Sequence, residues 1–116
     1  MPFNSVLLVE YVDGENWLLT APLVYTDTKM NKAVEVPAGF ITDFASVPRG
    51  MWNLYPKVGL YAPAAVVHDF MYRYGIYTRK IADDMFLHGM EDLKVSWLVR
   101  HTMHKAVRLF GRGNYK

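Results

Sequence analysis

A histidine followed directly by an aspartate, His68-Asp69, lies near the middle of the chain, and Tyr72 comes four residues after the histidine. On a helix His68 and Tyr72 would share a face, because residues i and i+4 are neighbours, whereas Asp69 would be rotated by roughly 100° from His68. A neutral imidazole can take a proton from water near neutral pH, provided that a carboxylate fixes its other nitrogen. The residue types and their spacing therefore suit proton-transfer chemistry better than simple packing.

Further carboxylates bracket this stretch on both sides. Asp43 lies upstream in a polar loop, and Asp83 and Asp84 lie downstream, on what reads as the next helix. Either Asp83 or Asp84 could supply the carboxylate that orients the His68 ring. Asp43 and Asp69 are hard oxygen ligands, which suit calcium or magnesium rather than zinc, and loop carbonyls could complete the metal shell. The set predicts a water-activating, metal-assisted hydrolase.

The elements that must position these residues are predicted as strands first and helices afterwards. Residues 6–12 and 17–25 are rich in β-branched, aromatic and leucine residues, and the Asp13-Gly14 pair between them supplies the positive φ of a tight turn. We therefore expect a hairpin. The alternation over residues 33–37 predicts a third strand at a sheet edge, and residues 39–41 are a candidate extension of the sheet.

Three helices are predicted in the second half of the chain. Pro63 suits the first turn of a helix because its φ is already helical, and Gly75 suits a C-terminal stop. Thr78 and Ser96 are the predicted N-caps of the two following helices. The predicted helices cover residues 63–74, 78–93 and 96–111.

The third predicted helix is amphipathic. Its apolar residues recur at three- and four-residue spacing and predict a core face made of Val99, Met103, Ala106 and Phe110. The opposite face is predicted to be basic and solvated, with Arg100, His101, His104, Lys105 and Arg108. His101 and His104 could in principle share a metal ion, but no third ligand lies near them in the sequence.

Composition bounds the protein class. The chain has 116 residues, of which 52% are hydrophobic and 15% aromatic, enough for one core and too few for two ordinary domains. We expect a single domain over 1–116, with a β-rich segment (1–41), a loop that carries a predicted metal ligand (42–62) and a helical core (63–111). The net charge of +2 is spread along the chain, which argues against a nucleic-acid-binding tail. The absence of cysteine excludes disulfides and thiolate metal sites.

Two further stretches bear on location and partners. The first residues lack a charged n-region, and the apolar run 6–9 is too short for a signal peptide or a membrane span, so we expect synthesis in the cytoplasm without a secretory signal. Trp52, Tyr55 and Tyr61 lie in a Pro- and Gly-rich stretch. Loop packing is the simpler interpretation of this aromatic cluster, and a membrane-interface or glycan platform is the alternative.

The stretch His68-Asp69-Phe70-Met71-Tyr72-Arg73 resembles the active-site helix of secreted phospholipase A2 enzymes, most of all the short bacterial and fungal branch with its HD-F-x-Y-R pattern. The similarity spans about residues 41–111 and keeps the order of the motifs. The other matching residues are Thr42-Asp43 and Pro48 in the upstream loop, Arg79, Asp83, Phe86 and Met90 on the next helix, and the closing Ala106-Val107-Arg108-Leu109-Phe110-Gly111.

This resemblance implies a role for each predicted site residue. His68 would be the general base, Asp83 would orient it, and Tyr72 would support the pair by a hydrogen bond. Asp69 would be a bidentate calcium ligand and Asp43 a loop calcium ligand. The chain departs from those enzymes in lacking their cysteines, their signal peptide and a recognisable glycine-rich calcium loop, and in carrying the β-rich segment.

Nearly the whole chain also resembles an uncharacterised family of small tailed-phage and prophage proteins, the domain of unknown function family 1353. The stretch Gly39-Phe40-Ile41-Thr42-Asp43-Phe44-Ala45-Ser46-Val47-Pro48 and the His-Asp helix carry this resemblance. It implies a phage origin and leaves the activity open.

The sequence thus predicts an α+β fold, with an N-terminal antiparallel hairpin or small sheet followed by a three-helix core like that of phospholipase A2. The first functional hypothesis is a phage-encoded, calcium-dependent lipid ester hydrolase that acts on the phospholipids of the host envelope, carried by the virion or released at lysis. The alternative is a non-catalytic component of the phage particle, of its tail above all, in which the added β-segment contacts other virion proteins. In that case the site is vestigial. Independently of both hypotheses, the His68-Asp69 pair has a simpler interpretation as a helix histidine beside a solvated acid.

Overall fold

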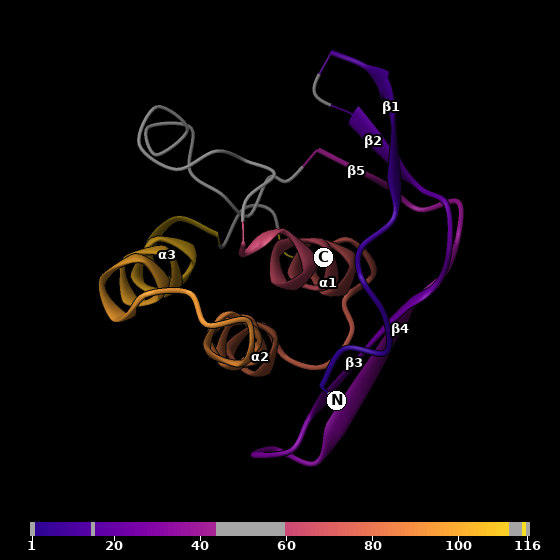
Figure 1. Ribbon diagram of the computed structural model, residues 1–116. Helices are drawn as coiled ribbons and strands as arrows, with labels where there is room; N and C mark the ends of the chain where they lie inside the picture. Colours follow the sequence, from indigo (N-terminus) through magenta and orange to yellow (C-terminus); the bar gives the residue numbers. More distant parts are fainter. Residues whose placement is uncertain (1, 15, 44–59, 112–114, 116) are drawn as a thin grey trace.

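The computed structural model describes residues 2–14, 16–43, 60–111 and 115. Within them the fold is α+β, as predicted, with short antiparallel strands followed by three helices (Figure 1). The strands are β1 (Val9–Asp13), β2 (Asn16–Leu19), β3 (Leu23–Asp27), β4 (Lys32–Val36) and β5 (Ile41–Thr42), and the helices are α1 (Ala62–Tyr74), α2 (Arg79–Asp92) and α3 (Trp97–Phe110).

The predicted hairpin is present at the start of the chain. β1 and β2 pair antiparallel, with Val9 opposite Leu19 and Tyr11 opposite Trp17. Gly14 has a φ of 49°, the left-handed conformation for which an Asp-Gly turn is suited. β5 pairs with the other edge of β2, so the expected extension of the sheet past residue 39 is confirmed.

The stretch 17–25, predicted as one strand, is two strands in two different sheets. β2 ends at Leu19, and β3 begins at Leu23 and pairs with β4 in a separate two-stranded sheet. Pro22 lies between them, and a proline has no N–H to donate to a strand ladder. The prediction of one continuous strand was wrong for this reason, whereas the prediction of an edge strand at β4 is confirmed within the described residues.

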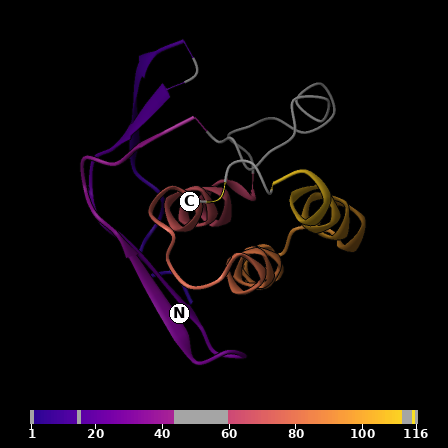
Figure 2. The ribbon, with the colours of Figure 1, turned by 180° about the vertical axis from the view of Figure 1, so that it is seen from behind.

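The helices form a second layer beside the strands. α1 and α2 both pack against the β3–β4 sheet, α1 also contacts β5, and α3 lies against α2 on the side away from the sheets (Figures 1 and 2). One hydrophobic core joins both halves of the chain. Its largest fully buried side chains include Tyr25, Leu19, Leu23 and Val36 from the strands and Phe86, Met71, Met85, Met90 and Met103 from the helices.

The helix ends are set by the predicted residues. Pro63 lies in the first turn of α1, and Gly75 ends that helix with a φ of 63° and an N–H that donates to the carbonyl of Met71. The Thr78 hydroxyl accepts a hydrogen bond from the N–H of Ile81 at 3.2 Å, which caps α2. Ser96 caps α3 in the same way.

The predicted core face of α3 is correct in part. Met103 is buried, but Phe110 is 79% exposed and Val107, absent from the prediction, is buried in its place. The buried face of α3 runs through Met103, Val107 and Gly111, at i, i+4 and i+8, and Gly111 packs against the Tyr72 ring. Phe110 lies to one side of this face.

Two other expectations concern the loop and the membrane. Trp52 and Tyr55 lie outside the described residues, while Tyr61 is buried at the start of α1, consistent with packing. In the part of the chain that the structure describes, no helix is both long and apolar enough to cross a membrane.

Candidate active site

The predicted site residues are brought together by the antiparallel packing of α1 and α2. Along the pair, contacts run in opposite directions: His68 meets Asp83, and one turn further on Tyr72 meets Arg79. At the other end Gly89 permits a close approach, because a Cβ there would lie 3.1 Å from the Cβ of Ala64. The absence of a side chain at Gly89 thus lets the two helices pack tightly at that end.

A buried histidine–carboxylate pair forms the centre of the site. His68 Nε2 lies 2.7 Å from Asp83 Oδ1, and the two side chains are 1% and 0% exposed. The Tyr72 hydroxyl donates to the same carboxylate oxygen at 2.5 Å. The hydrogen bond predicted between His68 and Asp83 is therefore present. Asp84, the other candidate partner, instead accepts from Lys80 and pairs with His104 of α3.

Two arginines hold the second oxygen of Asp83. Arg108 of α3 donates to Asp83 Oδ2 at 2.8 Å, and Arg79 Nε lies 4.0 Å from the same oxygen. Arg79 also donates to the carbonyls of Val107 and Arg108, both at 2.7 Å, and so ties the end of α3 to the start of α2. The Asp83 carboxylate is thus the point at which all three helices meet.

The environment sets the protonation of this pair. Burial lowers the pKa of His68, because a charged imidazolium is poorly solvated there, and it outweighs the opposing effect of Asp83. Burial alone would raise the pKa of Asp83, but hydrogen bonds from His68, Tyr72 and Arg108 outweigh it and lower that pKa. Asp83 is therefore an anion and His68 a neutral ring at neutral pH. Nε2–H donates to Asp83, which leaves the lone pair on Nδ1.

Tyr72 and Phe86 fix the plane of the imidazole. The Phe86 ring stacks on His68 with a centroid distance of 4.6 Å, and the Tyr72 ring lies 4.2 Å away. Burial and the neighbouring Asp83 carboxylate raise the pKa of Tyr72 well above its usual value. The phenol therefore stays protonated and acts as a donor to Asp83.

The two predicted metal ligands lie where α1 faces β5, away from the His68–Asp83 pair. Asp69 is on α1, and Asp43 directly follows β5. Asp69 is buried and accepts a hydrogen bond from the Thr42 hydroxyl at 2.6 Å. Arg73 lies beside both predicted ligands, with its Nη2 3.5 Å from Asp69 Oδ2 and 3.9 Å from Asp43 Oδ1. Burial raises the pKa of Asp69, although Thr42 and Arg73 oppose the rise. A guanidinium thus supplies the positive charge where calcium was expected.

Three residues of the site carried no assigned function in the sequence. Thr42 and Arg79 enter the prediction only through the resemblance to phospholipase A2, and Arg108 is predicted on the solvated face of α3. Arg79 could have been found, because it precedes Asp83 by four residues on the same helix and so shares its face. Arg108 could not, because its contact depends on how α3 packs against α2.

Fold and site together define an α+β protein whose helices enclose a His–Asp pair held by two arginines. A family described as Protein of unknown function (DUF1353) matches residues 17–107, a span that contains His68, Asp83, Tyr72 and Arg79 and ends one residue before Arg108. The chain belongs to that family. No curated protein and no solved structure matches it.

Proposed function

We propose that the protein is a carboxylic ester hydrolase of phospholipase A2 type, in which His68 activates a water molecule. One observation carries the proposal, the buried contact of 2.7 Å between His68 Nε2 and Asp83: with Nε2–H as donor to this carboxylate, Nδ1 is the nitrogen that would accept a proton, and burial, which lowers the pKa of the ring, favours the neutral imidazole. A general base needs this combination, since an imidazole that is already protonated cannot accept a proton from water.

The steps follow from the residues of the pair. Nδ1 of His68 takes a proton from water, and the resulting hydroxide attacks the ester carbonyl to form a tetrahedral intermediate. Asp83 stabilises the imidazolium that forms, through its bond to Nε2–H. Collapse of the intermediate releases the alcohol, which takes the proton back from Nδ1, and leaves the carboxylic acid. Tyr72 and Arg108 keep the Asp83 carboxylate oriented throughout.

The proposal includes a calcium ion, with Asp43 and Asp69 as its ligands. Their oxygens, with the Thr42 hydroxyl, are donors of the type that calcium prefers, and the buried Asp69 carboxylate gains from a nearby cation. They are too few to complete a shell, and within the described residues no group of three His, Asp or Glu side chains could hold a metal. A bound calcium ion would polarise the ester carbonyl and would have to displace Arg73.

The substrate class and setting rest on the resemblance of residues 41–111 to the bacterial and fungal phospholipases. We propose a phospholipid of the host envelope as substrate and a phage as the source of the protein, which would then act from the virion or after lysis.

The test measures hydrolysis of a fluorescent phospholipid at millimolar calcium. His68→Gln should lower the rate by about 10²–10⁴, as loss of a general base does. His88→Gln is the matched control, because His88 also pairs with an aspartate, Asp27, at 2.7 Å but lies outside the site. It should leave the rate unchanged. The enzyme hypothesis would be refuted if both variants lost the same activity, or if the wild type hydrolysed no phospholipid.

A non-catalytic role in the phage particle is the second proposal. The nearly complete burial of His68 and the arginine contacts to Asp83 also suit a structural link between helices. The β1–β2 hairpin exposes Tyr11 and Val12, apolar side chains that another virion protein, of the tail above all, could cover. The two proposals are distinguished by incorporating His68→Gln into virions and measuring their infectivity. A structural role is supported if these virions are fully infective and the wild-type protein hydrolyses no lipid.

A further inference from the structure

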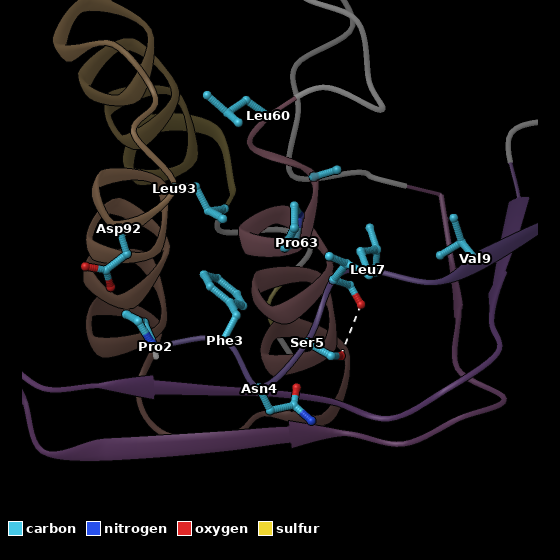
Figure 3. Close-up of a pocket in the computed structure, with 12 residues that line it drawn as sticks. Pro2, Phe3, Asn4, Ser5, Leu7, Val9, Leu60, Pro63, Asp92 and Leu93 are labelled. Carbon is cyan, nitrogen blue, oxygen red and sulfur yellow. Dashed lines mark hydrogen bonds between the residues drawn. The ribbon is translucent and has the colours of Figure 1, made fainter.

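An apolar cavity lies at the end of the α1–α2 pair, separate from His68 and Asp83. Its volume is about 640 Å³, within the range of small-molecule sites. The side chains of Phe3, Leu7, Pro63 and Leu93 converge on it in Figure 3, from the N-terminal segment, the start of α1 and the end of α2.

One wall of the cavity is the N-terminal segment 2–9, which is attached to the strands near its two ends. The Asn4 N–H donates to the carbonyl of Val24 at 2.9 Å, and the Leu8 carbonyl accepts from the Thr20 N–H at 3.0 Å. Between these attachments Val6 is 74% exposed although it lines the cavity, and Leu60 on the opposite rim is 60% exposed. A bound apolar group would remove these side chains from water, which is favourable.

The lining carries almost no charge. Asp92 is the one ionisable side chain among the described lining residues; its carboxylate accepts a hydrogen bond from the Tyr25 hydroxyl at 3.1 Å and points away from Phe3 and Pro63 in Figure 3. The amide oxygen of Asn4 is likewise used, by the N–H of Val24. Among the lining residues that the structure describes, none is a cation that could pair with an acid. The chemistry of this wall suits an uncharged hydrocarbon group.

We propose that this cavity is a binding site for an uncharged hydrocarbon chain or ring, such as the tail of an alcohol or ester. The site is independent of the proposed hydrolase, because no residue of the His68–Asp83 network lines it. It therefore survives or fails separately from that function.

The experiment titrates the full chain with N-phenyl-1-naphthylamine, an uncharged probe whose fluorescence rises in apolar surroundings. The wild type should bind it saturably at one site. Val6→Asp places a carboxylate on the cavity rim and should weaken binding at least tenfold. Val12→Asp is the matched control, because Val12 is also an exposed valine of the N-terminal region but does not line the cavity. It should change binding less than twofold, and His68→Gln should not change it.

Competition then tests the ligand class. In the series hexanol, octanol and decanol, each added methylene should strengthen displacement of the probe by roughly threefold to fourfold until the cavity is full. Decanoate should compete at least tenfold less well than decanol, because the lining residues described above include no cation for its carboxylate.

The site is confirmed if the methyl resonances of Leu7 and Leu93 shift on binding while those of Leu98 and Leu109 on α3 do not. Three results would overturn it: no saturable binding by the wild type, equal effects of Val6→Asp and Val12→Asp, or decanoate that competes as well as decanol. A loss of activity in His68→Gln with unchanged probe binding would leave the cavity proposal intact.

Discussion

Asp83→Asn tests whether the buried carboxylate holds the three helices together. Its oxygens accept hydrogen bonds from His68, Tyr72 and Arg108, one residue from α1, another from the next turn of α1 and the last from α3. An asparagine keeps one carbonyl oxygen for Nε2–H of His68. It replaces the other oxygen by an NH₂ group, which would face the Arg108 guanidinium as donor against donor.

The magnitude follows from what is left unpaired. Breaking a fully buried ion pair costs about 3–5 kcal/mol, mostly because the remaining charge stays desolvated. The side chains of Arg108 and Arg79 are 35% and 20% exposed, so water can solvate them in part. We therefore expect the free energy of unfolding to fall by about 2–4 kcal/mol, the upper part of the range for single substitutions.

Urea denaturation, followed by circular dichroism, measures this loss. With a slope of about 1–3 kcal/mol/M for a domain of this size, the midpoint should move down by roughly 1–2 M. The adjacent Asp84→Asn is the control, because the Asp84 side chain is 22% exposed and one partner, Lys80, is 72% exposed. It should cost less than about 1 kcal/mol. If both variants lost the same stability, the central role assigned to Asp83 would be wrong.

Three further predictions follow from the same contacts. Burial lowers the pKa of His68 below its ordinary 6.5, so the unfolded chain binds a proton at a higher pH than the folded protein does. The contribution of His68 to stability should be complete above pH 6.5, and the free energy of unfolding should fall below that pH by up to about 1.4 kcal/mol per pH unit. Urea titrations at pH 5.0–7.5 measure this slope, and His68→Gln should remove it. If Asp43 and Asp69 bind calcium, a hundredfold excess over Kd should add about 2.7 kcal/mol, which Asp69→Asn should abolish; an unchanged melting midpoint at millimolar calcium in the wild type would exclude the site. Gly89→Ala should destabilise by about 1–3 kcal/mol in calorimetry, since its Cβ would lie 3.1 Å from the Cβ of Ala64, whereas a neutral result would mean that α1 and α2 can separate at no cost.

Local signals in the sequence were enough to predict most of the secondary structure. Pro63, Gly75, Thr78 and Ser96 mark helix ends through backbone chemistry that acts over a few residues, and the Asp13-Gly14 turn does the same for the hairpin. The prediction of one strand over residues 17–25 was wrong because it rested on apolar composition and disregarded Pro22, which has no N–H to donate to the hydrogen bonds between strands.

The partnership of His68 with Asp83 was also within reach of the sequence. Helical periodicity places His68 and Tyr72 on one face, and the short connection after Gly75 returns the chain along α1 as an antiparallel helix. The sequence alone left Asp83 and Asp84 as alternatives, because adjacent residues on a helix differ by only about 100° in direction.

Only the tertiary structure decided which groups surround that pair and which lie elsewhere. Arg108 reaches Asp83 because α3 packs on α2 in one particular register, which no spacing within α3 reveals. Asp43 lies near Arg73 of α1 because β5 packs beside that helix, whereas the contact of Arg73 with Asp69 is a local i,i+4 pair within α1. Contacts between segments far apart in the chain depend on how whole elements pack, and a sequence pattern records only what lies within one element.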